Sequence, residues 1–343
     1  MKFRVSASLL SVFGIAVASS AAPLAAESVG LSRVSSVQTN TGPIGAARRG
    51  GLEQFTPAPD PQDHTIDYQY LDKALEWMVI PMGPSIREGA PTVQQNTGTR
   101  RIYGHTSRFR LEGNRVAFSF FKDEQRETLT EYRRDLERVG SELDIATLPR
   151  NEQLAFWMNL HNVAVIEALA YEYTLSDSRT RSFGPNKASL QDAKLVTVKG
   201  VALSPRDIRE GIVYANWNDP KIIYGFWRGE IGGPSIQRAA FTSDNISRLL
   251  DLSAEEYVNS LRAIEKYSGA LRLSAIYEEA LPSLFNGEES LRQHLSRYAR
   301  DDVKALIART EKLRFKSYEH DIADLIRGTS APAVWNYTPL INM

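Results

Sequence analysis

The fold of this 343-residue chain is decided by the stretch Leu154-Ala155-Phe156-Trp157-Met158-Asn159-Leu160-His161-Asn162, which continues to Ala170. Thirteen of the seventeen residues from Leu154 to Ala170 are apolar. A helix that is apolar all round has to be covered on every side by the rest of the protein. The stretch therefore predicts a buried central helix over about residues 149–173.

The polar residues of this helix are informative, because burying an amide or an imidazole without partners costs about 1–3 kcal/mol. At about 100° per residue, Asn159 and Asn162 share one stripe, and His161 is expected on the opposite side. We therefore expect that His161 and the asparagine pair do not serve one compact site. The asparagines either tie the helix to loops through backbone hydrogen bonds or line a polar cleft. His161 is interpreted as a core or interface histidine, and Glu167 as exposed or paired with an arginine.

Patterns downstream of the helix predict a small sheet and further helices. Two short apolar runs flank Lys199-Gly200 and predict a hairpin over residues 195–203. Ser204 and Asp207 form a capping box, so a helix is expected to begin there and to run to about residue 214. The remaining expected elements are a hairpin over about 109–120, a strand over 222–227 and helices over about 66–80, 123–140, 244–266, 274–284, 288–298 and 301–311. These elements predict a mainly helical α+β single domain with a small, largely antiparallel sheet.

The N-terminal residues have the order of a secretory signal peptide, with Lys2 and Arg4 before an apolar run over 7–17 and small residues up to Ala26. The run is shorter than the roughly 20 apolar residues of a membrane span, so we expect no stable span and cleavage after Ala26, with a cut after Ala21 as the alternative. The mature chain is expected to divide into a flexible leader, a folded domain and a tail, at residues 27–63, 64–327 and 328–343. The protein is thus expected in the periplasm or outside the cell.

Composition excludes several classes of function. The chain has 41 basic and 41 acidic residues and no cysteine. Without thiols it has no cysteine nucleophile, zinc–thiolate site or iron–sulfur cluster. Balanced charge argues against general nucleic-acid binding. The five histidines lack the helical spacing of a zinc-hydrolase motif, so neither a metal nor a cofactor is expected.

The central helix resembles the A-F-W-x-N-x-Y-N helix of the domain-of-unknown-function family 547. Residues 200–208 are similar to that family's strand, turn and S-x-x-D-I helix start, and residues 219–222 resemble its D-P-R-I segment. Residues 273–277 resemble a later L-S-x-I-[FY] segment, and residues 317–321 a worn form of a terminal Y-D-W motif. The resemblance covers about residues 64–325.

The departures from this family concern a histidine and two cysteines. Many members follow the D-P-R-I segment with H-F-A-L-x-C-G and then C-P-x-L, an arrangement that invites comparison with papain-like and transglutaminase-like thiol hydrolases. The corresponding residues here are Ile223, Arg228 and Gly233. Neither isoleucine nor arginine replaces a general base or a nucleophile. If the family is catalytic, the resemblance implies a catalytically silent relative.

No residue is assigned a catalytic role. The ligand-binding candidates lie on the central helix, around the glycine loop 229–233 and in the C-terminal motif, and they are Asn159, Asn162, Trp227, Arg228, Glu230 and His320. Backbone amides of the loop, with the Arg228 guanidinium beside them, suit an anion. The alternative is a plain glycine loop. We expect Arg228→Ala to weaken ligand binding and to leave folding intact.

Two functions remain open. In the first, the chain is an exported, non-catalytic binding or interaction domain of the cell envelope, whose partner is a peptide, a glycan or a protein. In the second, it is a hydrolase or transferase that uses carboxylate or imidazole chemistry through Glu230, His320 and Asn162. The lack of a recognisable nucleophile and base favours the first. A His320 within hydrogen-bond reach of Glu230 or Asp321 in an open pocket would favour the second.

Overall fold

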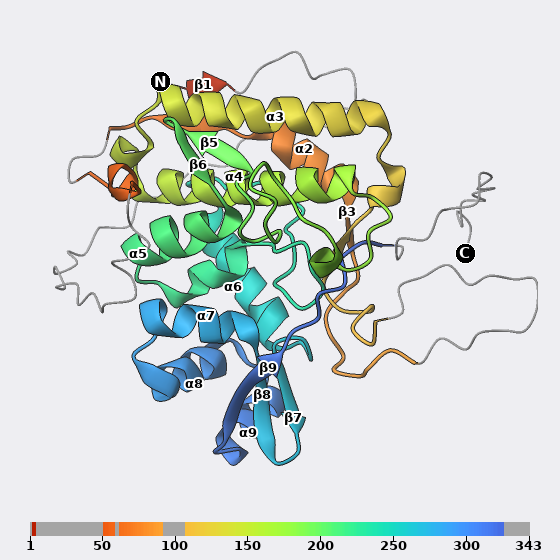
Figure 1. Cartoon of the computed structure of the whole chain (residues 1–343). Coiled ribbons are helices and arrows are strands. Elements are labelled where there is room, and N and C mark those ends of the chain that lie inside the picture. Colours follow the sequence, from red (N-terminus) through yellow and green to blue (C-terminus); the bar gives the residue numbers. More distant parts are fainter. Residues whose placement is uncertain (1, 5–50, 59–61, 92–106, 326–343) are drawn as a thin grey trace, which may run out of the picture.

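The central helix is α4 (Arg150–Tyr171), which runs across the upper half of the view in Figure 1 with other helices above and below it. The structure is a computed structural model that describes residues 2–4, 51–58, 62–91 and 107–325. Every residue of α4 from Glu152 to Glu167 is buried. Trp157 packs edge-on against Phe55 and Phe156, with ring centroids 5.1 and 5.0 Å apart. The prediction of a buried central helix is therefore confirmed.

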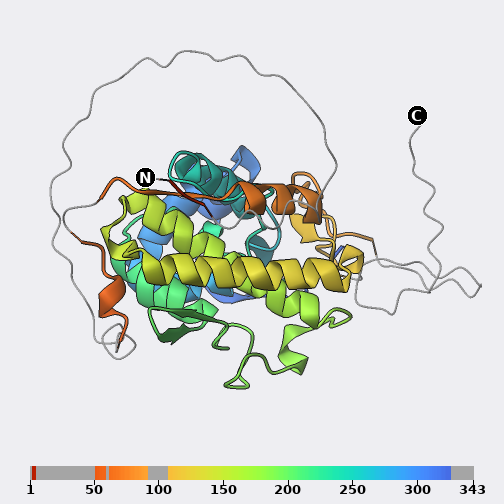
Figure 2. The ribbon, with the colours of Figure 1, turned by 90° about the horizontal axis from the view of Figure 1, so that it is seen from above.

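Further helices pack around α4 in layers. The long helix α3 (Asp123–Glu142) runs alongside α4 on its outer side, as Figures 1 and 2 both show. Glu167 of α4 pairs there with Arg133 of α3. Of the two expectations for Glu167, exposure or pairing with an arginine, the second is therefore the one found. The other helices are α2 (Gln69–Met78), α5 (Tyr214–Asn216), α6 (Ile246–Val258), α7 (Ala275–Leu284), α8 (Gly287–Tyr298) and α9 (Asp301–Arg309).

The strands form small separate sheets, so the fold is α+β and mainly helical. The largest sheet has the order β7 (Ile264–Tyr267), β8 (Ala270–Ser274), β9 (Leu313–Ser317), with β7–β8 antiparallel and β8–β9 parallel. Two antiparallel pairs join β3 (Val79–Pro81) to β4 (Asn114–Val116) and β5 (Val196–Val198) to β6 (Val201–Leu203). A parallel pair joins β1 (Lys2–Arg4) to β2 (Thr65–Asp67).

The hairpin and the capping box after α4 are where the sequence places them. Strands β5 and β6 turn at Lys199-Gly200, where both residues have positive φ. The Ser204 hydroxyl accepts a hydrogen bond from the Asp207 amide, and the Asp207 carboxylate accepts one from the Ser204 amide. The helix that follows is wider than an α-helix over the π-helical segment η6 (Asp207–Val213) and then continues as α5.

The strand predicted over residues 222–227 is wrong, because these residues lie mostly in the 3₁₀ helix η7 (Pro220–Gly225). Asp219 caps η7 by accepting a hydrogen bond from the Lys221 amide, and Pro220 stands at its first position. A short apolar run is buried in either conformation, so its pattern does not distinguish them. A Cβ on Gly225 would lie 2.4 Å from Met158 Sδ, which shows how closely η7 approaches α4.

Two other predictions of local structure are wrong. Residues 109–120 do not form a hairpin, since β4 pairs with β3 and the chain before it is a turn. The helix predicted to reach residue 266 ends at Val258, and strand β7 begins at Ile264. The partner of β4 lies about 35 residues earlier, so the local pattern could not reveal that pairing. Strand β7 instead pairs with β8 across the tight turn Ser268-Gly269, a local hairpin that the helical reading of this segment missed.

The segment of residues 319–325 ties several parts of the body together. Its residues form isolated bridges from Asp321 to Asp177, from Ile322 to Glu230 and from Asp324 to Val116. The Ile231 and Gly232 amides donate to main-chain carbonyls of this segment, at 2.8 and 2.9 Å. The sequence-predicted C-terminal motif therefore lies beside the glycine loop.

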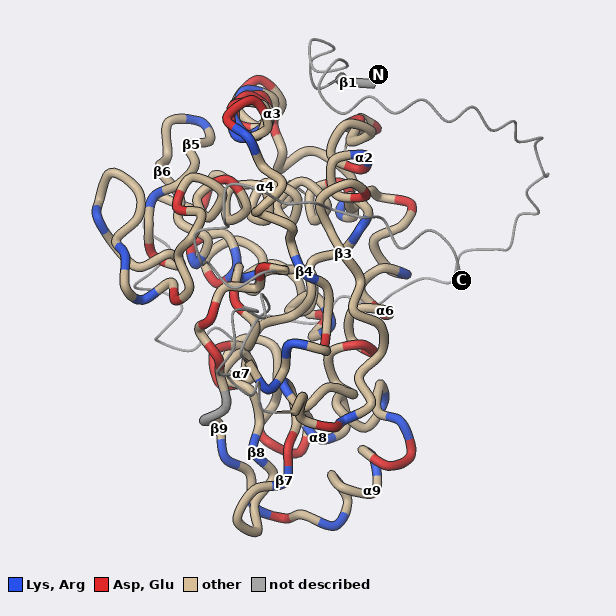
Figure 3. The backbone as a smooth tube through the Cα atoms, turned by 90° about the vertical axis from the view of Figure 1, so that its right-hand side faces the viewer, with Lys and Arg blue, Asp and Glu red and all other residues tan. Residues whose placement is uncertain are grey.

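Basic and acidic positions are interspersed over the described part of the chain. In Figure 3 blue and red segments are scattered along the tube between long uncharged stretches. Within the described residues, no helix combines the length and the apolar character that crossing a bilayer requires. Of the predicted signal peptide only residues 2–4 are described, and the predicted tail 328–343 lies outside the described residues.

Candidate functional site

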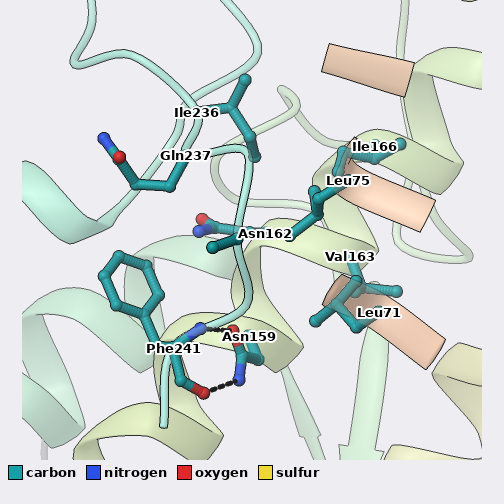
Figure 4. Close-up of a pocket in the computed structure, with 10 residues that line it drawn as sticks. Leu71, Leu75, Asn159, Asn162, Val163, Ile166, Ile236, Gln237 and Phe241 are labelled. Carbon is teal, nitrogen blue, oxygen red and sulfur yellow. Dashed lines mark hydrogen bonds between the residues drawn. The ribbon is translucent and has the colours of Figure 1, made fainter. Parts of the chain in front are cut away.

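The first asparagine of the central helix binds a neighbouring backbone segment. Asn159 Nδ2 donates to the Phe241 carbonyl at 2.7 Å, and its Oδ1 accepts from the Phe241 amide at 3.0 Å. Figure 4 shows this pair of bonds beside a cavity of about 10 Å³, the size of one water molecule. Apolar side chains, among them Leu71 and Val163, form much of the cavity wall. Asn159 thus ties α4 to the chain around residue 241.

The second asparagine binds the segment that follows η7. Asn162 Nδ2 donates to the Gly225 carbonyl at 3.0 Å, and its Oδ1 accepts from the Trp227 amide at 2.9 Å. Both bonds are buried, so Asn162 fixes the backbone that leads into Arg228. Trp227 itself is 1 % exposed and belongs to the core.

His161 is in contact with Asn162, so the expectation that it lies apart from the asparagines is wrong for Asn162. Its Nδ1 is 3.0 Å from Asn162 Oδ1, and its Nε2 is 3.1 Å from Arg209 Nη1. A guanidinium only donates, so Nε2 accepts and the proton is on Nδ1, which donates to Asn162. Burial, and then the Arg209 charge, lower the pKa of His161 well below its ordinary value. Adjacent positions on a helix are only about 100° apart, so the side chains of His161 and Asn162 can reach each other and form a hydrogen bond.

Beyond His161, two buried guanidiniums share one carboxylate. Arg228 Nη1 and Nη2 donate to Glu279 at 2.9 and 2.6 Å, a bidentate contact. Arg209 donates to both oxygens of Glu279 at 3.2 and 3.3 Å. Gln191 joins the two arginines, because its Oε1 accepts from Arg209 and its Nε2 donates to the Arg228 carbonyl. We call the connected residues the polar seam, which comprises Asn162, His161, Arg209, Gln191, Glu279 and Arg228.

The electrostatics of the polar seam keep its acid and bases ionised. Burial alone would raise the pKa of Glu279, but Arg209 and Arg228 lower it far below the ordinary value. Burial opposes the charge on Arg228, yet Glu279 raises the pKa of Arg228 above the ordinary value. With His161 neutral, the seam holds two positive charges and one negative charge. An arginine in such an environment is held by its carboxylate and cannot transfer a proton.

The seam reaches the surface at Arg206. Arg206 Nη1 lies 3.8 Å from Glu279, and the same side chain pairs with Asp192 and Glu210. These residues border an open surface pocket of about 520 Å³, which is lined by Asp192, Arg206, Asp207, Glu210 and Gly211. We call it the Arg206 pocket.

A second polar group lies at the glycine loop. The Glu230 carboxylate is buried and accepts hydrogen bonds from the Ser178 hydroxyl and from His320 Nδ1, the latter at 3.2 Å. The His320 side chain is 35 % exposed and packs against the Tyr318 ring. The carboxylate stands between hydroxyl and imidazole, whereas in a serine hydrolase the imidazole stands between the other two. His320 meets the predicted distance to Glu230, but it does not line the Arg206 pocket.

The backbone amides of the glycine loop are bonded within the fold. The Ile231 amide donates to Asp321, the Gly232 amide to Glu319 and the Gly233 amide to Glu230. The loop therefore fits the second alternative, a plain glycine loop whose amides bind main-chain carbonyls and not an anion. The Arg228 fork beside it is bound to Glu279.

The expectation that Arg228→Ala leaves folding intact does not fit this environment. The Arg228 side chain is 9 % exposed, and its removal would leave the buried Glu279 with one guanidinium fewer. We now expect this substitution to destabilise the protein.

Several residues of the site had little or no signal in the sequence. Glu279, Gln191 and Arg209 lie on three separate segments, and each is an ordinary polar residue of its own local pattern. Only the approach of the segments in space brings them together, so a local pattern could not find them. A weak signal existed for Arg209, which interrupts the buried positions Ile208 and Ile212 of one helix.

Comparison with known proteins gives one match. Residues 145–258 match the model of a family described as Protein of unknown function, DUF547. This confirms the resemblance, over a shorter range than the motifs suggested. The matched range contains α4, Arg209, Arg228 and Glu230, whereas Glu279 and His320 lie beyond it. No curated protein and no solved structure matches the chain.

Proposed function

We propose, with the DUF547 match as premise, that this chain is an exported, non-catalytic binding domain of the cell envelope and a silent relative of a thiol-hydrolase-like family. One observation carries the proposal. Arg228, which stands where the family motif has a cysteine, is bound bidentately to Glu279 in a buried seam. A guanidinium in such a pair is neither a nucleophile nor a base.

The second motif position supports the same conclusion. Ile223 stands where the family motif has a histidine, and it is 1 % exposed within η7. An aliphatic side chain cannot move a proton, and a buried one cannot meet a substrate. The accessible part of the site is therefore the Arg206 pocket, where a peptide, a glycan or a protein partner would bind. Arg206 and the carboxylates that bind it, Asp192 and Glu210, form the polar wall that the partner would meet.

Export is supported by the N-terminal residues alone, through Lys2, Arg4, the apolar run and the small residues up to Ala26. Cleavage after Ala26 would remove β1 and with it the pairing of β1 with β2. The test is to express the full chain with a C-terminal tag, to separate cytoplasm from envelope and periplasm, and to measure the intact mass. We expect a mature chain that begins at Glu27, outside the cytoplasm. A full-length chain in the cytoplasm would contradict the proposal.

Binding without turnover is tested on the chain of residues 27–343. We expect soluble envelope glycan and peptide fragments, titrated by calorimetry, to bind and to be recovered unchanged. Arg206→Gln should weaken binding, because it removes the guanidinium of the pocket and the charge that balances Asp192 and Glu210. Arg181→Gln is the matched control, since Arg181 is an exposed arginine outside the pocket lining. Equal affinity of wild type and Arg206→Gln would refute the Arg206 pocket as the site.

A second candidate function rests on the contact between His320 and Glu230. A partly exposed imidazole on a buried carboxylate has the arrangement of a general base. A hydrolase or transferase of this kind would cleave an ester or an amide and would lose its turnover in His320→Gln. Turnover in a screen of esters and amides that disappears in His320→Gln would favour this candidate over the binding domain. Absence of turnover in the wild type would favour the binding domain.

A further inference from the structure

A second surface pocket lies where α6, the end of α8 and the loop after β3 meet. Its volume is about 580 Å³, within the range of small-molecule sites. It shares no lining residue with the polar seam or with the Arg206 pocket. Its lining residues are Pro81, Gly83, Pro84, Ser85, Asn114, Leu252, Glu255, Glu256, Asn259, Arg297, Tyr298, Ala299 and Arg300. We call it the α6–α8 pocket.

Hydrogen bonds between distant segments hold the walls of this pocket in place. Arg87, just after the loop, donates to main-chain carbonyls at the end of α6 and at Ile264, the last at 2.9 Å. Asn259 Nδ2 donates to the Tyr298 carbonyl at 2.9 Å, and Asn259 Oδ1 accepts from the Arg300 amide at 2.7 Å. Three segments far apart in sequence are thus fixed to one another. A pocket fixed in this way loses little conformational freedom when a ligand binds.

The two carboxylates of the pocket differ in whether they already have an ion-pair partner. Glu256 is engaged by Ser235 and by Arg262, so its charge is compensated from inside. Glu255 is exposed, and no ion pair joins its carboxylate to another of the residues that the structure describes.

The cations of the pocket are held loosely. Arg297 lies over the Tyr298 ring at 5.6 Å and forms no ion pair within the described chain. Arg300 approaches Asp302 only at 3.7 Å. The pocket also has an apolar lining, because Leu252 is 47 % exposed and two prolines line it.

We propose that the α6–α8 pocket binds a small zwitterionic molecule of the amino-acid or dipeptide class. The ligand ammonium pairs with Glu255, its carboxylate pairs with Arg297 and Arg300, and its apolar part lies against Leu252. A guanidinium suits a carboxylate, since its donors match both oxygens. The proposal goes beyond the function proposed above and is independent of export and of what the Arg206 pocket holds.

The experiment titrates the mature chain of residues 27–343 with the dipeptide alanyl-leucine and with its N-acetylated and C-amidated forms. We expect saturable binding of the free dipeptide and about tenfold weaker binding of each blocked form, as for the loss of one charged hydrogen-bond partner. Glu255→Gln should weaken the free dipeptide about tenfold and leave the N-acetylated form unchanged. Arg297→Gln should weaken the free dipeptide about tenfold and leave the C-amidated form unchanged.

The control is Arg248→Gln, an exposed arginine of α6 outside the pocket lining, which should bind like the wild type. Unchanged thermal unfolding of all three variants verifies that they are folded. The proposal is overturned by no saturable binding up to about 10 mM, a concentration well above a millimolar dissociation constant. It is equally overturned when the blocked forms bind as tightly as the free dipeptide, or when Arg248→Gln weakens binding as much as Arg297→Gln.

Discussion

Asn159 shows how a buried amide can be required by a fold. Its side chain satisfies both the N–H and the C=O of Phe241, in a region where no bulk solvent replaces them. In Asn159→Leu both backbone groups lose their partner, at about 1–3 kcal/mol each. We expect the free energy of unfolding in urea to fall by about 2–6 kcal/mol. The control is Asn151→Leu in the exposed first turn of the same helix, and an equal effect of both substitutions would contradict the argument.

Arg228 is a residue whose structural role decides what its removal does. Arg228→Ala leaves Glu279 buried with Arg209 as its remaining ion-pair partner within the seam. Breaking a buried pair by removing one partner costs about 3–5 kcal/mol, and we expect a loss of stability of this size. The double variant Arg228→Ala/Glu279→Gln completes a double-mutant cycle, measured by urea unfolding. Additive losses in this cycle would show that the two side chains do not interact.

At the scale of single elements, the capping box predicts where the helix after β6 begins. The Ser204 hydroxyl accepts from the Asp207 amide at 3.1 Å, which satisfies one unpaired donor of the first turn. Ser204→Ala is expected to destabilise the protein by about 1 kcal/mol, as read from the urea midpoint. Ser182→Ala, at an exposed serine, is the control and should change the midpoint little. A midpoint for Ser204→Ala equal to that of the control would show that the cap contributes nothing.

Elements were predictable from the sequence where their signal is local. The hairpin at Lys199-Gly200, the capping box and α4 each follow from residues within one short window, and the structure contains all three. The strand β9 had no such signal, because it pairs in parallel with β8 about 40 residues earlier and is recognised only in that sheet. The run in η7 was misread, since a buried apolar segment satisfies strand and helix equally.

The candidate site divides in the same way. Asn159 and Asn162 stood out because they interrupt an apolar helix, and the structure gives both of them backbone partners. Glu279, which binds the two buried arginines, gave no signal at all. Its partners Arg209 and Arg228 are 70 and 51 residues away, and the encounter depends on the packing of α7 against the body. Polar residues in an apolar element are therefore visible in the sequence, whereas networks between elements are not.

At the scale of the whole molecule, buried titratable groups couple stability to pH. Burial lowers the pKa of His294 from 6.5 to about 4, and its Nε2 lies 3.0 Å from the Tyr224 hydroxyl. Between pH 6.5 and 4 the His294 imidazole is therefore protonated in the unfolded chain and neutral in the folded chain. His161 acts in the same direction, because its pKa is also lowered. Stability is fully present above pH 6.5 and falls as the pH decreases through this window.

At lower pH, stability depends on the carboxylate of the polar seam, Glu279. The pKa of Glu279 is lowered by its two arginines, so its stabilising effect is present above its ordinary value of 4.5 and is lost below it. We expect the urea midpoint to decrease from pH 7 to pH 4 and to decrease further below that. In His294→Gln the first decrease should be smaller by about 2 kcal/mol, a figure reduced for the partial exposure of the imidazole. The lower window should be unchanged in this variant, since Glu279 keeps both arginines. If the urea midpoint of His294→Gln decreases as much as that of the wild type between pH 7 and pH 4, the fold does not lower the pKa of His294.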